Sequence, residues 1–142
     1  MIFTLGLALI GTFTGLSALH CYWLCGGKLG ITGAIPQIEG KAAFKPPWPA
    51  TAAVAAGLLL CAGLIASLIG ILPAPASEKA LQLAAYVLAA IFALRAVGDF
   101  NFVGFSKRQR GSRFARLDTV VYSPLCTILA AAVFAVGCSA KP

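Results

Sequence analysis

Four long runs of apolar residues occupy most of this 142-residue chain and limit what it can fold into. They cover about residues 2–26, 50–72, 79–98 and 117–138. Hydrophobic residues make up 60% of the chain and charged residues 11%, less than half of the roughly 25% that soluble domains carry. A chain this poor in charge must place much of its surface in lipid, so the runs are predicted to span a membrane.

Each run is close to the length of about 20 residues that a helix needs to cross hydrocarbon. Backbone polar groups in lipid must pair internally, and these runs lack the two-residue alternation of barrel strands. We therefore expect an all-α polytopic integral membrane protein, a four-transmembrane-helix bundle that forms one domain over residues 1–142. The first run lacks the basic region and the small-residue cleavage site of a signal peptide, so we expect it to remain as a helix.

Lysine and arginine are distributed unevenly between the loops. The predicted loop 27–49 contains three and loop 99–116 contains five, whereas the other loop and the C-terminus contain one each, Lys79 and Lys141. The positive-inside rule then predicts that the first two loops are cytoplasmic and both termini extracytoplasmic, in the inner membrane of a bacterium. Aromatic residues at the inner ends of the helices agree with this orientation, namely Tyr22, Trp23 and Trp48.

The formal net charge of +7 comes largely from the basic loop 107–116. This loop adjoins a membrane helix and carries no nucleic-acid-binding motif, so no nucleic acid is expected as a partner. Membrane lipids, including anionic lipids at this loop, are the expected partners, although topology determination alone would also explain the charge. Assembly into a homo-oligomer or a larger membrane complex stays open.

Small residues recur at helical spacing along three of the runs. They are Gly11, Gly15 and Ala18 in the first run, Ala56, Gly63, Ser67 and Gly70 in the second, and Ala85, Ala89 and Ala93 in the third. Lipid tails offer no hydrophobic drive for helix association, so close packing through small residues is expected to hold the bundle together. A dimerisation face is the alternative reading of the same pattern.

Ionisable residues at membrane depth are few, and three runs place them near the same, cytoplasmic end. His20 is the single histidine, Arg95 and Asp99 are four residues apart and can pair, and Asp118 and Tyr122 have the same spacing. Burying such groups in a membrane is costly, which makes them functional candidates by default.

Together with Trp23, these five residues form the predicted ligand-binding pocket. In it His20 acts as an acid, base or donor, Asp118 orients His20, and Arg95 binds an anionic head group or neutralises the carboxylates. The structural alternative stays open, in which Arg95 extends to the interface and pairs with Asp99, and Asp118 caps the fourth helix. His20 would then donate to a neighbouring helix.

Ser123-Pro124 interrupts the fourth run. Proline removes a backbone donor, so we expect a kinked, continuous helix there. A new helix capped by Ser123 is the alternative, but it leaves only about 22 Å of helix for a core of about 30 Å.

The five cysteines do not form a recognisable redox or metal pattern. Cys21 and Cys25 are predicted at the reducing, cytoplasmic end, and the others are scattered, so we interpret them as packing residues. His20 lies about 140° around the helix from Cys25, which argues against a metal site. No cofactor is therefore expected, while a redox role for Cys21 and Cys25 stays open.

Three stretches carry a specific pattern: His-x-Tyr-Trp at 20–23, Arg-x-x-Gly-Asp at 95–99 and Asp-Thr-x-x-Tyr-Ser-Pro at 118–124. In these stretches the chain resembles the bacterial domain-of-unknown-function family numbered 3995. The resemblance implies a small four-helix membrane protein of bacteria and supplies no activity. The residues that carry it coincide with the predicted pocket.

Three classes of function follow. The first is a protein that binds or moves a lipid head group or a small polar solute in the pocket. The second is a small membrane enzyme that uses acid-base chemistry of His20 and Asp118 on a lipophilic substrate, and the third is an accessory subunit of a larger membrane complex. Whether the protein is an enzyme is not decided by the sequence.

Overall fold

Four helices in the described part of the chain, residues 1–38 and 41–139 of a computed structural model, are long and apolar enough to cross a membrane. The spans are α1 (Ile2–Leu24), α3 (Trp48–Leu68), α4 (Glu78–Val97) and a last run that joins α5 (Arg113–Leu117), η1 (Asp118–Tyr122) and α6 (Ser123–Ser139). The expected all-α bundle of four spans is confirmed, and the fold is that of a multi-pass membrane protein.

The helix ends follow from local sequence. Ser77 and Ser112 cap α4 and α5, because their side chains accept hydrogen bonds from the backbone amides three residues later. α3 ends at Leu68, four residues before the predicted end at 72. Gly70 has a φ of 78°, and the amide of Ile71 donates to the carbonyl of Ala66 at 2.8 Å. This closing motif, which glycine permits, stops the helix while the apolar run continues.

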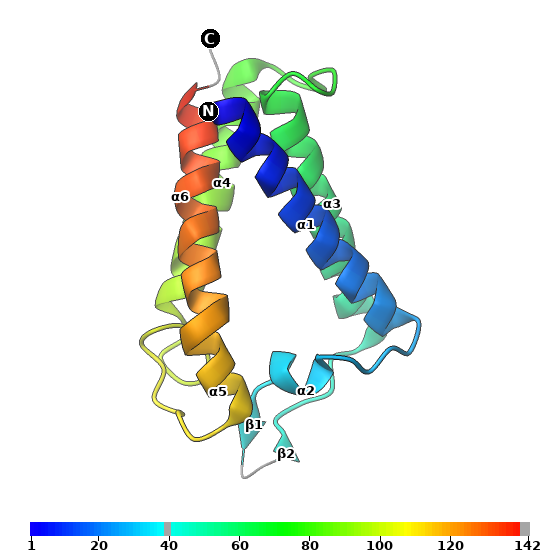
Figure 1. The fold of residues 1–142 in the computed structure, drawn as a ribbon, viewed down its shortest axis with the longest axis vertical. Coiled ribbons are helices and arrows are strands. Elements are labelled where there is room, and N and C mark those ends of the chain that lie inside the picture. Colours follow the sequence, from blue (N-terminus) through cyan, green and yellow to red (C-terminus); the bar gives the residue numbers. More distant parts are fainter. Residues whose placement is uncertain (39–40, 140–142) are drawn as a thin grey trace.

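The helices are arranged as two pairs, α1 beside α3 and α4 beside α6. The pairs meet at the end of the molecule that holds the N-terminus and separate toward the other end (Figure 1). Where they meet, buried side chains from all four spans form the core: Leu9, Phe13, Ala62, Ile65, Ala85, Ala89, Leu129, Ala132, Val133 and Val136. Phe13 also stacks on Phe92 with the ring centroids 5.7 Å apart.

The predicted small-residue faces are used only in part. Ala85 and Ala89 are buried in the core, as expected. Gly11 and Gly15 are exposed, and a Cβ on either would meet nothing within 4 Å, so the expectation for the first helix is wrong. α1 instead packs through the face that contains Ser17, whose hydroxyl donates to the carbonyl of Ala55 in α3 at 2.8 Å. This polar link brings α1 and α3 together on the opposite side of α1 from the glycines.

The last span is continuous through Ser123-Pro124, as predicted. Ser123 has helical backbone angles (φ −68°, ψ −44°), so the alternative of a new helix capped by Ser123 is wrong. The turn before the proline, Asp118–Tyr122, is a π-helix. A widened turn of this kind accommodates the proline ring and the missing amide, and such turns often occur at functional sites.

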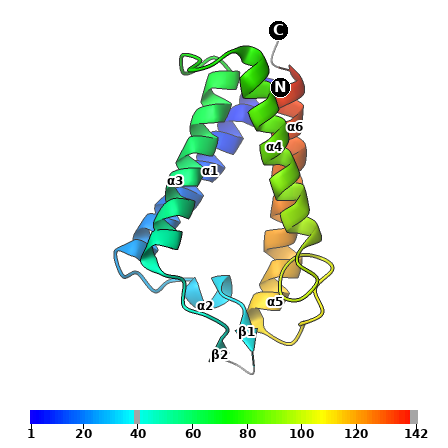
Figure 2. The same ribbon diagram turned by 180° about the vertical axis from the view of Figure 1, so that it is seen from behind.

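The first loop crosses the end where the two pairs separate (Figure 2). It contains α2 (Ile31–Ala34) and the two-residue antiparallel strands β1 (Gln37–Ile38) and β2 (Lys41–Ala42). α2 packs against α5, and a Cβ on Gly33 would come within 2.7 Å of the Leu117 side chain. The loop therefore connects the α1 and α3 pair to the last span.

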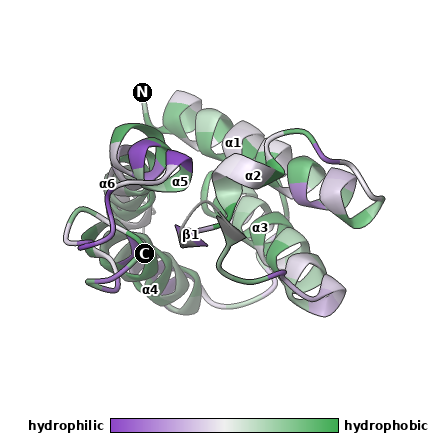
Figure 3. Ribbon diagram, turned by 90° about the horizontal axis from the view of Figure 1, so that it is seen from below, coloured by the Kyte–Doolittle hydropathy of each residue, from purple (hydrophilic) through white to green (hydrophobic). Residues whose placement is uncertain are grey.

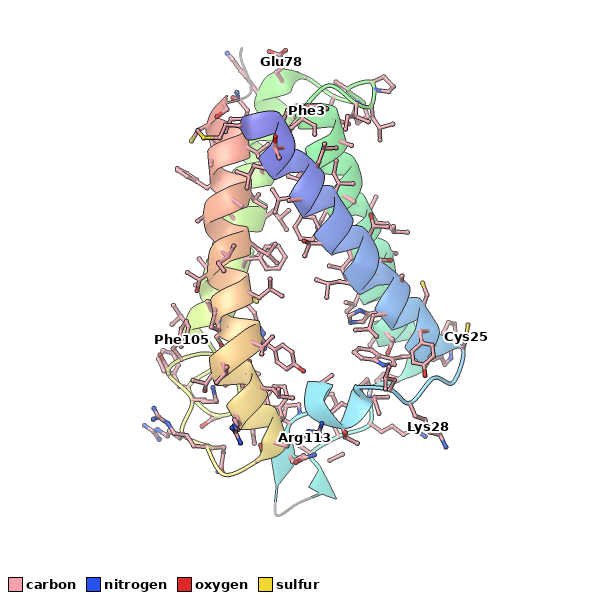
Figure 4. All side chains as sticks on the ribbon, in the orientation of Figure 1. Phe3, Cys25, Lys28, Glu78, Phe105 and Arg113 are labelled. Carbon is pink, nitrogen blue, oxygen red and sulfur yellow. The ribbon has the colours of Figure 1, made fainter. Side chains whose placement is uncertain are left out.

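Basic residues gather at this loop end. Seen from that end, hydrophilic residues are concentrated on α5 and on the chain between α4 and α5 (Figure 3). Lys28 and Arg113 lie there, while Glu78 lies at the opposite end (Figure 4). Lys141 lies outside the described residues. The structure thus places the loops predicted to be cytoplasmic at one end.

Candidate functional site

The chain between α4 and α5 folds around Asp99. One oxygen of its carboxylate, Oδ1, accepts hydrogen bonds from the backbone amides of Asn101, Phe102 and Val103 at 2.9, 2.7 and 3.0 Å. Burial alone would raise the pKa of Asp99, but these amides stabilise the charged form and hold its pKa below the ordinary value. Asp99 therefore shapes a tight turn directly after α4.

Two glycines close this turn. Gly98 and Gly104 have φ angles of 98° and 84°, and a Cβ on either would collide with the backbone of the other. Only glycine tolerates both the positive φ and this approach. The amide of Gly104 is thereby directed toward Asp118, 14 residues further along the chain.

Asp118 is fully buried at the start of η1, with 0% of its surface exposed. Its Oδ1 accepts from Arg95 Nη2 at 2.7 Å. Its Oδ2 accepts from the Gly104 amide at 2.7 Å, from Lys107 Nζ at 2.9 Å and from the Ser123 hydroxyl at 3.2 Å. A buried carboxylate is stable only with this kind of pairing, and the bonds join α4, the following turn and the last span.

Lys107 is a member of this cluster that sequence reasoning missed. Its position in the basic loop 107–116 predicts contact with anionic lipids, yet it is only 3% exposed. Its ammonium donates to Asp118, to the Gly104 carbonyl at 2.9 Å and to the Thr119 hydroxyl at 2.7 Å, which uses all three hydrogens. Gly98 and Gly104, which fold the turn back toward Asp118, are a sequence signal that could have indicated this arrangement.

Arg95 pairs with Asp118 and not with Asp99, so the pairing of Arg95 with Asp99 that their spacing suggested is wrong. Asp99 is held by the turn amides, while Asp118 lies opposite the guanidinium. The Arg95 side chain is 33% exposed, and its Nη1 atom is buried without a hydrogen-bond partner in residues 1–38 and 41–139. Arg95 therefore keeps unused donor capacity.

His20 and Trp23 lie on the other helix pair, at the loop end of α1. His20 Nδ1 donates to the Leu16 carbonyl at 2.7 Å, and its ring meets the edge of Trp23 with centroids 4.9 Å apart. Trp23 donates from Nε1 to the Leu29 carbonyl at 2.8 Å. In the described part of the chain, Asp118 accepts from Arg95, Gly104, Lys107 and Ser123 and not from His20. The predicted contact by which Asp118 would orient His20 is therefore not formed. The two residues belong to helix pairs that separate at this end (Figure 1).

Tyr122 faces the first loop. Its hydroxyl donates to the carbonyl of Gly33 in α2 at 3.0 Å, and its ring lies 6.2 Å from that of Phe114. The six predicted residues thus divide into the Arg95 and Asp118 pair, the Asp99 turn, the His20 and Trp23 contact on α1, and the Tyr122 link to α2.

A cavity of about 320 Å³ lies between the first loop and the chain around Arg95. Two of the predicted site residues, Arg95 and Asp99, line it. The rest of the lining is apolar and consists of Ala34, Pro36, Ala43, Phe44, Phe102, Val103 and Phe114. The cavity therefore combines one cation, one anion and three aromatic rings at the ends of two spans.

Metal ligands are not clustered in the part of the chain that the structure describes, where no three His, Cys, Asp or Glu side chains come together. The five cysteines are unpaired, and Cys21 and Cys25 are exposed at the end of α1. The side chains at the cavity offer ionic, hydrogen-bonding and aromatic contacts.

Four apolar spans, two of which are linked by a buried ion-pair cluster, define a small multi-pass membrane protein. The chain belongs to the family described as "protein of unknown function (DUF3995)", whose profile matches residues 13–133. This confirms the resemblance found in the sequence, and all six predicted site residues lie within the match. The comparisons with curated proteins and with solved structures find no match.

Proposed function

We propose that this protein binds the polar head group of an amphipathic molecule in the cavity between its first loop and Arg95. The observation that carries the proposal is an apolar, partly aromatic cavity of about 320 Å³ with an arginine in its wall whose side chain is 33% exposed. Ligand sites are typically concave and mostly apolar with a few convergent polar groups, and their volumes begin near about 300 Å³.

The charges around Arg95 favour an acidic group on the ligand. Asp118 contributes one negative charge, and Arg95 and Lys107 contribute two positive charges. Lys107 is buried and spends all its donors on the cluster, so the surplus charge is available at Arg95. A planar guanidinium held by Asp118 suits a phosphate or carboxylate.

The position of the cavity favours a membrane ligand. Arg95 lies in the last turn of α4, and Phe114 lies in the first turn of the last span. Both places correspond to the interface, where the head groups of lipids lie. The exposed arginines 108, 110, 113 and 116 at the same end support a cytoplasmic orientation and contact with anionic lipids.

The enzymatic alternative receives less support. It required His20 and Asp118 to act together, but His20 bonds to its own helix and Asp118 accepts four hydrogen bonds within the cluster. A carboxylate paired with two cations is a poor general base.

The proposal is tested by filling the cavity. Ala43 lines it, whereas the neighbouring Ala42 does not, so Ala43→Trp and Ala42→Trp form a matched pair. Wild type and both variants would be purified in the same mild detergent and analysed by native mass spectrometry with lipid extraction. We expect a defined amphiphile to copurify with wild type and Ala42→Trp and to be lost from Ala43→Trp. Equal binding by the two variants, or none by wild type, would overturn the proposal.

A further inference from the structure

The cavity presents two opposite charges that do not neutralise each other. Arg95 and Asp99 both line it and are four residues apart. The guanidinium is held by Asp118, and the Asp99 carboxylate is held by the amides of the turn. Both therefore remain as separate charged groups in one wall.

Each of these groups has capacity left for a ligand. Arg95 lines the cavity with a side chain that is 33% exposed, and its Nη1 atom, itself buried, has no hydrogen-bond partner in the described residues. Asp99 uses Oδ1 for its three backbone amides, and within the same described ranges its Oδ2 takes part in no hydrogen bond or ion pair. A ligand that brings one acidic and one cationic group would satisfy both sides.

The aromatic lining adds a second preference for a cation. Phe44, Phe102 and Phe114 all border the cavity. The face of an aromatic ring attracts an ammonium group, most strongly where water is excluded. An acidic ligand without an amine would gain nothing from these rings and would bring its charge close to Asp99.

We propose that the ligand is a zwitterion, whose phosphate or carboxylate pairs with Arg95 and whose ammonium group lies between Asp99 and the phenylalanine rings. This inference rests on the proposed function and specifies its ligand class. The same chemistry is present in the head group of a phosphatidylethanolamine and in a free zwitterion such as phosphoethanolamine. The volume of about 320 Å³ suits a head group and leaves acyl chains outside, in the membrane.

The test compares three probes on the purified full chain: a short-chain phosphatidylethanolamine, the phosphatidylglycerol of equal chain length, and free phosphoethanolamine. Binding is measured by native mass spectrometry and calorimetry in one detergent. We expect wild type to bind the phosphatidylethanolamine about tenfold more tightly than the phosphatidylglycerol, as one extra ionic contact would give. Displacement by phosphoethanolamine at similar concentration assigns the site to a soluble zwitterion, and failure to displace assigns it to the lipid; either result supports the zwitterion.

Asp99→Asn removes the charge and keeps an amide oxygen that can accept the turn amides. We expect it to erase the preference for phosphatidylethanolamine, whereas Glu78→Gln, at the opposite end, leaves the preference unchanged. Phe44→Leu provides a variant outside the turn and should weaken phosphatidylethanolamine binding alone. Its control is Phe105→Leu, another exposed phenylalanine that does not line the cavity.

The two proposals fail in distinguishable ways. If phosphatidylglycerol binds wild type as tightly as phosphatidylethanolamine and Ala43→Trp abolishes both, the cavity binds head groups but the zwitterion inference is wrong. If Asp99→Asn and Phe44→Leu keep the full preference, the inference is likewise wrong. If no probe is sensitive to Ala43→Trp, the proposed function itself fails.

Discussion

Asp118 is the central anion of the polar cluster at the loop end of the molecule. It is fully buried, and its two oxygens hold Arg95, Lys107, the Gly104 amide and Ser123 in place. Buried ion pairs add little net stability when complete, but removal of one partner leaves an uncompensated charge. The cluster is therefore most sensitive to loss of its single anion.

Substitution Asp118→Asn is expected to destabilise the protein by about 3–5 kcal/mol, because Lys107 would stay buried without a counter-charge. Denaturant unfolding in a fixed detergent measures this loss. Glu78→Gln, which is exposed, should change stability by less than about 1 kcal/mol. The double variant Lys107→Met/Asp118→Asn should recover part of the loss, since both buried charges are then gone. Unchanged stability of the single variant would contradict the role assigned to the cluster.

Asp99 makes the turn after α4 sensitive to acid. Its pKa is held below the ordinary value by the turn amides, so its contribution is complete above about pH 4 and is lost as the pH falls through the lower folded-state pKa. Hydrogen-exchange protection of the amides of residues 101–103 should therefore decrease with acid in that range. In Asp99→Asn the protection should not change over the same range. A turn that opened with rising pH instead would contradict this sign.

At the scale of elements, the turn between α4 and α5 depends on two facing glycines. Gly98→Ala would bring a methyl group against the carbonyl of Val103 and force a positive φ on alanine. Overpacking and strain together are expected to cost at least about 2 kcal/mol. Gly111→Ala is the matched control, because a Cβ there meets nothing within 4 Å and the φ is not positive. Thermal unfolding of both variants in one detergent checks the prediction, and equal melting temperatures would refute it.

The π-helical turn η1 and the short helix α2 hold the walls of the cavity in place. η1 contains Asp118 and Tyr122, so one turn supplies both the anion of the cluster and the hydroxyl that holds Gly33 of the first loop. The cavity lies between the parts that this turn connects. Its walls are therefore positioned by two hydrogen-bonded contacts that originate in a single widened turn.

At the scale of the whole molecule, the two helix pairs share a core at one end and separate at the other, where the first loop and the chain between α4 and α5 lie (Figure 1). These two segments and α5 contain most of the basic residues. The positive-inside rule predicts that the loop end faces the cytoplasm. A cysteine-free protein with Lys28→Cys, Arg110→Cys or Glu78→Cys tests this with a membrane-impermeant maleimide. In intact spheroplasts only Glu78→Cys should be labelled, and in inverted vesicles the other two. Labelling of Lys28→Cys from outside would reverse the orientation.

The sequence by itself determined the four spans, their boundaries to within a few residues and the gathering of charge at one end. These properties depend on the hydropathy, length and flanking charge of continuous stretches, because those quantities decide whether and in which direction a helix crosses a membrane. It also singled out Arg95, Asp99, Asp118 and Tyr122 as polar residues near the loop end. Burying such groups in lipid is costly, so their presence in or beside a span indicates a role.

Only the tertiary structure decided how these residues combine. The pairing of Arg95 with Asp118, the burial of Lys107 and the link from Tyr122 to Gly33 join residues between 11 and 89 positions apart. Local periodicity carries no information about such contacts, so Asp99 was assigned as the partner of Arg95 and His20 as that of Asp118. The turn closed by Gly98 and Gly104 brings Lys107 to Asp118, and the separation of the helix pairs leaves His20 on the other side. The cavity likewise exists only because the first loop folds back over the ends of α4 and α5.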